Sequence, residues 1–173
     1  MRKIIIMLFF VVLPSFLFGT EVVQNGISYS IDEEKKTAEA IGYDQSSSYV
    51  TIPSTITVDG KSYAVVSIGK KAFWNNDKLQ RVTIEDGVLD IKMAAFYYCR
   101  YLRSVKLPAT LKSVGSSAFW KSLSLSSIYI PASLTDLNAD AFTEGGMIAY
   151  EVSPDNPVYS SEDGIMFNKE KTE

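Results

Sequence analysis

Apolar and polar positions alternate along this chain in a pattern that repeats every 23 residues. The pattern is anchored by an Ala-Phe dipeptide that occurs four times at this spacing, at Ala72-Phe73, Ala95-Phe96, Ala118-Phe119 and Ala141-Phe142. Each of the first three copies continues with a leucine and an apolar-x-apolar triplet, as in Leu79, Val82 and Ile84. A fixed period of this length is the sequence signature of a solenoid, in which each repeat forms one coil.

Two short elements are expected in each coil. The alternating triplet places both apolar side chains on one face of a short β-strand, and Pro108 and Pro131 end that strand in two repeats. The Ala-Phe segment is expected to form a turn of helix or 3₁₀ that directs the phenylalanine ring inward. Because one coil cannot bury its own apolar edge, the coils are expected to stack into a continuous core.

The fourth copy of the pattern is one residue shorter than the third. Phe142 precedes Met147 by five residues, whereas Phe119 precedes Leu125 by six. A deletion near Gly145-Gly146 restores the register. The residues that then take the leucine and strand places are Met147, Tyr150 and Val152.

The chain on either side of the repeats has a different pattern. Residues 20–64 alternate like β-strands and contain Asp59-Gly60, a strong hairpin signal. They are expected to form an N-terminal β-hairpin cap that covers the edge of the first coil. The repeats are expected to occupy residues 65–156 in about four coils. Residues 157–173 are expected to begin a further incomplete repeat, in a fragment or in a protein that ends part-way through a repeat.

The first 19 residues are not expected to join this core. Arg2 and Lys3 precede a 15-residue apolar run, Ile4 to Phe18. A helix of that length is about 22 Å long, too short for a hydrocarbon layer of about 30 Å. We therefore expect a secretory signal peptide at residues 1–19, cleaved after Gly19 or within a few positions of it. The alternative is an uncleaved membrane anchor.

Charge is unevenly distributed, although the net charge of the chain is only −3. Residues 20–64 carry seven acids and three bases, residues 65–133 carry four acids and ten bases, and residues 134–173 carry nine acids and two bases. The basic middle has two interpretations. It is either a site for an anionic partner or a set of solvated faces that keep the repeats soluble.

Residue types that many catalytic sites require are missing. The chain has no histidine, which excludes Ser-His-Asp and Cys-His catalysis and all histidine metal sites. A single cysteine, Cys99, excludes an internal disulfide and thiolate zinc sites. No glycine-rich phosphate loop or positioned acid–base pair is evident, and the chain is not basic enough for nucleic acid. We therefore expect no enzyme, no cofactor and no metal.

The repeat resembles the BspA-like leucine-rich repeats of bacterial surface proteins. Their consensus, Leu-x-x-Ile-x-Ile-Pro-x-x-Leu-x-x-Ile-Gly-x-x-Ala-Phe, is matched here by Leu102-Arg-Ser-Val-Lys-Leu-Pro-Ala-Thr-Leu111-Lys-Ser-Val-Gly115-Ser-Ser-Ala-Phe119. The likeness is strong over about 65–168 and weaker before it. Cys99 takes a small-residue position of the family and is expected to be structural. The resemblance implies a leucine-rich-repeat solenoid, β-rich with short strands, that is secreted or held at the cell surface.

Two sets of residues are candidates for ligand binding. The first set lies along the expected strands. Thr83, Lys106 and Tyr129 take the outward positions between buried residues, Arg81 lies one step before the buried valine, and Arg103 lies beside these positions. Residues that follow a core phenylalanine form the second set, and they are Trp74, Tyr97 and Trp120. Such aromatic residues are typical of binding hot spots, but they also serve to close the edge of a coil.

The expected function is that of a binding module. A sheet with cations and no deep pocket suits an anionic protein or glycan better than a small metabolite. The family resemblance implies adhesion to host extracellular-matrix proteins or to other cells, although function does not follow from fold alone. The alternative is a structural or spacer module of a larger surface protein, with no ligand of its own.

Overall fold

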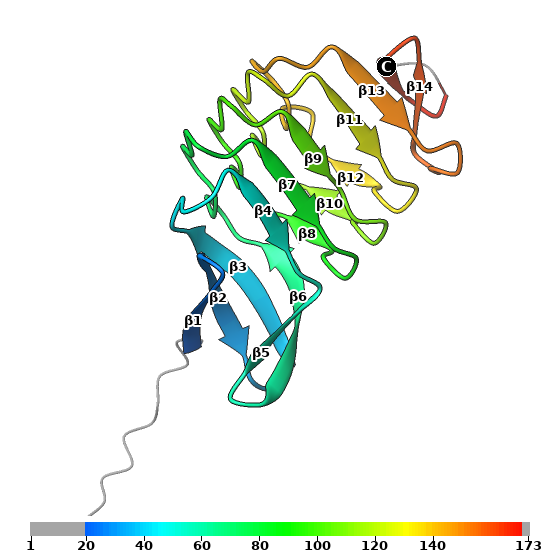
Figure 1. Cartoon of the computed structure of the whole chain (residues 1–173). Helices are drawn as coiled ribbons and strands as arrows, with labels where there is room; N and C mark the ends of the chain where they lie inside the picture. Colours follow the sequence, from blue (N-terminus) through cyan, green and yellow to red (C-terminus); the bar gives the residue numbers. More distant parts are fainter. Residues whose placement is uncertain (1–19, 171–173) are drawn as a thin grey trace, which may run out of the picture.

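The computed structural model describes residues 20–170, which form a stack of strands and turns coiled about one axis (Figure 1). The expected signal peptide, residues 1–19, lies outside the described residues. The strands are β1 (Thr20–Gln24), β2 (Ile27–Asp32), β3 (Thr37–Tyr43), β4 (Tyr49–Ile52), β5 (Thr55–Val58), β6 (Lys61–Ile68), β7 (Arg81–Ile84), β8 (Asp90–Ile91), β9 (Ser104–Lys106), β10 (Ser113–Val114), β11 (Ser127–Ile130), β12 (Asp136–Leu137), β13 (Ala149–Val152), β14 (Tyr159–Glu162) and β15 (Ile165–Asn168).

Five parallel strands, β4, β7, β9, β11 and β13, form one side of the solenoid, which we call the strand face (Figure 1). β7 pairs with β4 and β9, and β11 pairs with β13. The register aligns Val50, Val82 and Val105, so equivalent apolar side chains form columns that point into the core. The predicted leucine-rich-repeat solenoid is confirmed by this arrangement.

A second ladder lies on the other side of the coils. Its parallel strands are the end of β6 and the two-residue strands β8, β10 and β12, and the same sheet continues through β3 and β2 to β1. Ile68, Ile91 and Val114 occupy equivalent positions in this ladder and are buried. The N-terminal strands therefore extend a sheet of the solenoid.

β4 was expected in the cap but is the first strand of the strand face. It pairs residue for residue with β7, from which it is 32 residues distant instead of 23. The β5–β6 hairpin accounts for the additional residues, and its turn residues Asp59 and Gly60 both have positive φ. The strand face consequently has five coils, one more than the four expected.

The segment around each core phenylalanine consists of tight turns, and residues 20–170 contain no helix. Lys71 and Asn75, two residues on either side of Phe73, have φ values of 62° and 54°, which a right-handed helix does not allow. The N–H of Trp74 donates to the Lys71 carbonyl within the turn, whereas the N–H of Phe73 donates to the Ala95 carbonyl of the next coil at 2.8 Å. The expected helical turn is replaced because alternate N–H groups bond along the solenoid axis.

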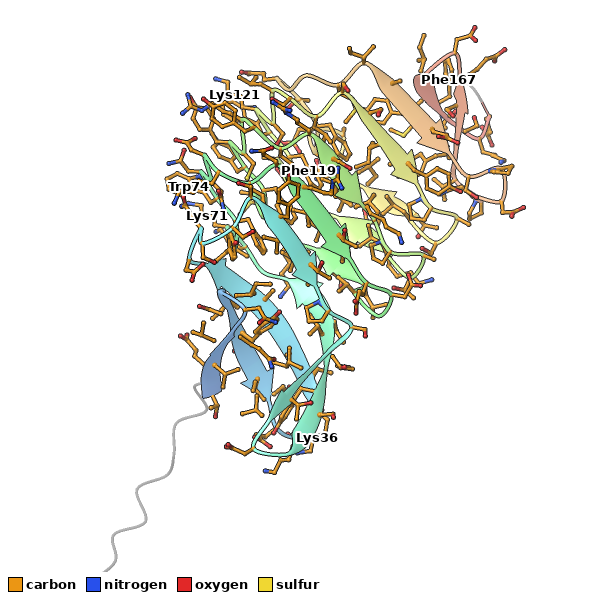
Figure 2. All side chains as sticks on the ribbon, viewed as in Figure 1. Lys36, Lys71, Trp74, Phe119, Lys121 and Phe167 are labelled. Carbon is orange, nitrogen blue, oxygen red and sulfur yellow. The ribbon has the colours of Figure 1, made fainter. Side chains whose placement is uncertain are left out.

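The core phenylalanines stack ring on ring through the solenoid. Successive ring centroids from Phe73 to Phe96, Phe119 and Phe142 are 4.9, 5.1 and 5.0 Å apart. Tyr43 continues the stack beyond Phe73, at 5.2 Å. Figure 2 shows Phe119 in the interior between the two ladders. This column spans every coil and is the centre of one continuous core.

The shortened fourth repeat keeps the register that the sequence predicts. Tyr150 and Val152 of β13 lie opposite Ile128 and Ile130 of β11. Met147 packs against the core. The deletion is therefore accommodated before the strand begins.

The chain after β13 forms an antiparallel hairpin, β14–β15, instead of the expected start of another coil. Its turn residues, Asp163 and Gly164, both have positive φ, as a two-residue Asp-Gly hairpin turn requires. The Tyr150 N–H donates to the Gly164 carbonyl at 2.8 Å, which holds the hairpin against β13. The Asp-Gly turn therefore forms a hairpin at the position where the repeat pattern predicts another coil.

Candidate binding surfaces

The first set of candidate residues lies on the strand face. Arg81 and Thr83 belong to β7, Lys106 to β9 and Tyr129 to β11, while Arg103 immediately precedes β9. Thr83 is paired with Lys106, and the apolar residues that alternate with them are buried. Arg81, Thr83, Lys106 and Tyr129 therefore project from the outer side of the strands, and Arg103 is exposed just before β9.

The cations of the strand face lack carboxylate partners among residues 20–170. Arg103 and Lys106 have no ion pair there, and Arg81 lies over an aromatic ring. By contrast, Arg100, which lies outside the strand face, is 3.1 Å from the carboxylate of Asp77. Arg81, Arg103 and Lys106 therefore form no ion pair within the described part of the chain.

Three of the five strand-face candidates line one shallow depression. Its volume is about 780 Å³, and Thr83, Lys106 and Tyr129 contribute to its lining together with Glu85 and Asp86. The Tyr129 side chain is 49% exposed, so its ring is available to a ligand. Arg81 and Arg103 lie outside the depression, nearer the beginning of their strands.

Sequence reasoning did not identify the two carboxylates of this depression. Glu85 accepts a hydrogen bond from the Ser54 N–H at 2.9 Å, and Asp86 accepts one from the Ala109 N–H at 2.7 Å. Each bond joins two coils, so it fixes the position of an otherwise exposed side chain. A signal was present, because Glu85 replaces the proline that follows the equivalent strand elsewhere, as at Pro108.

The second set of candidates lies on a different surface, the edge where the chain leaves each core phenylalanine. Figure 2 shows Trp74 on this edge, along with two lysines. Tyr97 and Trp120 stack with their ring centroids 4.5 Å apart, and the Lys121 ammonium lies 4.2 Å from the centroid of Trp120. Trp74 is 48% exposed, with the Lys71 ammonium 5.6 Å from its ring centroid. Tyr97 and Trp120 therefore stack on each other, whereas the ring of Trp74 contacts a lysine.

Two further tyrosines on this edge were missed because they lie outside the position directly after phenylalanine. Tyr98 contacts the Trp120 ring at 6.5 Å, and Arg100 lies 5.1 Å from the Tyr98 centroid. Tyr101 is 50% exposed. The edge is thus a cluster of rings whose faces are largely occupied by other rings and by cations.

The contacts of Trp120 predict that it contributes more to stability than Trp74. Trp120→Ala removes a stacked pair and a cation–π contact, so we expect it to lower the free energy of unfolding by about 1 kcal/mol more than Trp74→Ala. Urea denaturation of the two single variants tests this order. An equal or larger loss for Trp74→Ala would contradict it.

Cys99 has a packing role in the interior. Its thiol is buried and donates to the Phe73 carbonyl at 3.1 Å, and Ser122 makes the equivalent bond to Phe96 in the next coil. Burial raises the pKa of the Cys99 thiol to about 12, so the thiol stays protonated at neutral pH. A protonated, buried thiol does not serve as a nucleophile.

Metal sites and membrane-spanning helices are both absent from residues 20–170. This part of the chain holds no group of three or more cysteine, aspartate or glutamate side chains arranged to bind a metal ion. It also holds no helix with the length and apolar character needed to span a bilayer.

The repeat identifies the family. The pattern described as BspA type Leucine rich repeat region matches residues 66–162, in six copies. The chain belongs to the BspA-type leucine-rich repeat family. This confirms the resemblance found in the sequence, and the match begins within β6 and extends to the end of β14.

Solved structures of other bacterial proteins are similar to this one. A leucine-rich repeat protein from Bacteroides capillosus is 30% identical, with a TM-score of 0.72 over 77% of this chain and 98% of that chain. The T. pallidum leucine-rich repeat protein is 21% identical, with a TM-score of 0.58 over 76% and 71% of the two chains. Pneumococcal vaccine antigen PcpA is 20% identical, with a TM-score of 0.51 over 90% and 55%. The last two likenesses concern the fold alone, and no curated protein matches the sequence.

Proposed function

We propose that this BspA-type repeat protein is an exported binding module that holds an anionic protein or glycan on its strand face. One observation carries the proposal, namely that Arg81 of β7, Lys106 of the adjacent β9 and Arg103 just before β9 are exposed and form no ion pair within the described residues. Unneutralised charge on an open surface attracts a partner of opposite sign and accelerates its association.

The architecture supports a large partner over a small metabolite. The strand face extends over five coils, and its depression is open and shallow. Ligands that are buried inside a protein require a deeper, enclosed pocket. Among large partners, host extracellular-matrix proteins are the class that we propose from the family resemblance, with secretion or display at the cell surface.

Export is supported by the basic and then apolar beginning of the chain, which lies outside the described residues. N-terminal sequencing of the protein recovered outside the cell should start near Thr20. Recovery of the chain in membranes with Met1 intact would instead support an anchor.

The binding proposal predicts a charge-dependent loss of attachment. Replacing Arg81, Arg103 and Lys106 together by Ser should weaken attachment to immobilised matrix proteins or to heparin by about tenfold or more at low salt. The same variant should also reduce the dependence of attachment on salt concentration, because fewer charges contact the partner.

A variant with the same change in net charge provides the control. Lys70, Lys78 and Lys112 are exposed and lie outside the strands of the strand face, so their joint replacement by Ser should leave attachment nearly unchanged. Equal losses in the two triple variants would show that net charge alone acts. Absence of attachment by the unmodified protein to every matrix protein and glycan would favour the spacer function.

A further inference from the structure

The charges of the strand face are ordered along its strands. Arg81 begins β7, and Lys106 lies on β9 opposite the middle of β7, at Thr83. Glu85 and Asp86 follow directly after β7. Over β7 and β9 the charge therefore changes from positive to negative in the direction in which the strands run, while the exposed acid on β13, Glu151, lies level with Tyr129.

The spacing of these opposite charges along the strand direction matches that of an extended peptide. Lys106 of β9 is level with Thr83 of β7, and Glu85 follows Thr83 by two residues, which corresponds to about 7 Å along the strand direction and one strand to the side. Asp86 follows Glu85, and its carboxylate reaches the coil of Lys106 at the Ala109 N–H. Side chains at positions i and i+2 of an extended peptide lie on the same side, also about 7 Å apart. A peptide that runs parallel to the strands at Lys106 therefore has its next side chain on that face level with the two carboxylates.

The carboxylates are held in place before a ligand arrives. The bonds from the Ser54 and Ala109 N–H groups fix one oxygen each of Glu85 and Asp86, while both side chains remain exposed. Tyr129 offers an exposed ring on the same depression. Fixed groups lose little conformational entropy on binding, which favours recognition at an otherwise shallow site.

We propose that the depression at Thr83, Lys106 and Tyr129 is a subsite for an extended peptide segment that carries an acidic and a basic side chain two residues apart. The acidic side chain lies at Lys106 and the basic one at Glu85 and Asp86. This inference rests on the proposed function and narrows the partner to a protein, because an acidic glycan has no basic group for the two carboxylates.

Short synthetic peptides test the subsite on the intact protein. The probes are blocked pentapeptides with the central sequences Asp-Ser-Lys, its reverse Lys-Ser-Asp, the neutral Asn-Ser-Gln, and Asp-Lys-Ser, in which the charges are adjacent. NMR titration should show amide shifts at Thr83, Lys106 and Tyr129 with one of the first two peptides. That peptide should bind about threefold or more tightly than the neutral and adjacent-charge peptides.

Two sets of variants separate the charges from the hydrogen bonds. Glu85→Gln with Asp86→Asn keeps an oxygen to accept each backbone N–H but removes both negative charges, and Lys106→Met removes the cation while keeping most of the side-chain volume. Each should reduce the affinity for the preferred peptide about threefold or more. Glu34→Gln with Asp155→Asn changes exposed acids elsewhere and should have no effect.

The subsite is refuted if the four peptides bind equally or shift other amides, or if Glu85→Gln with Asp86→Asn leaves the affinity unchanged. Circular dichroism establishes that each variant is folded, and the comparison among peptides on the unmodified protein is independent of any substitution. The proposed function is judged separately, because attachment that depends on Arg81, Arg103 and Lys106 does not require the two carboxylates.

Discussion

Phe96→Ala is expected to lower the free energy of unfolding by about 3–5 kcal/mol, since it opens a cavity in the middle of the phenylalanine column. The Phe96 side chain is completely buried and stacks on Phe73 at 4.9 Å and on Phe119 at 5.1 Å. Both neighbours are held by hydrogen bonds between coils, so they cannot easily close the gap. Urea or guanidinium denaturation followed by circular dichroism measures the loss.

The effect should also spread to the adjacent coils. Because each coil of a solenoid packs mainly on its neighbours, hydrogen exchange should accelerate in β8 and in the neighbouring strands β6 and β10. Leu123→Ala is a suitable control, since that side chain is 52% exposed. A loss below about 1 kcal/mol for Phe96→Ala would contradict the central role of the column.

The phenylalanine column was predictable because equal spacing places equivalent residues of successive coils in contact. The left-handed residues beside it were not predictable. Lys71, Ala94 and Ser117 all have positive φ at the same position of the repeat, yet none of them is glycine or asparagine. Their conformation is imposed by hydrogen bonds to the next coil, an interaction that local propensity does not register.

At the two ends of the solenoid, the 23-residue period does not predict the structure correctly. β4 has the alternation of a repeat strand, but the β5–β6 hairpin separates it from β7 by 32 residues, so a search at a period of 23 passes over it. At the other end, the sequence pattern predicts another coil around Asp163-Gly164, but these two residues form a hairpin turn. Asp59-Gly60, the same dipeptide, also forms a hairpin turn. An insertion between two repeats, or a strong local turn, therefore changes the structure without changing the period elsewhere in the sequence.

The candidate surface was predictable in part. Alternation along the strands is sufficient to place Thr83 and Lys106 on the outer side, because a strand has a period of two. The depression depends on how the chain turns after β7, which alternation does not describe. The period also predicts ion pairs, because residues 23 positions apart lie next to each other in adjacent coils. Asp77 and Arg100 form such a pair, and so do Lys121 and Glu144. No aspartate or glutamate lies 23 residues before or after Arg103 or Lys106.

Gly146→Ala is expected to lower the free energy of unfolding by about 1–3 kcal/mol, because the added methyl group has no space. A Cβ atom at Gly146 would lie 2.0 Å from the Leu123 carbonyl oxygen, a backbone atom that moves only with its coil. The deletion in the fourth repeat draws the chain over the preceding coil at this point. Chemical denaturation measures the loss.

Gly145→Ala provides a matched control one residue away. The nearest atom to its added Cβ would be the Phe142 carbonyl oxygen at 3.3 Å, and neither glycine has the positive φ that disfavours alanine. Alanine at this position should cost well under about 1 kcal/mol, since it also restricts the unfolded chain. Equal losses at the two positions would show that flexibility of the Gly-Gly pair is required. A loss confined to Gly146 would show that the shortened repeat depends on the close approach of two backbones, which only a residue without a side chain permits.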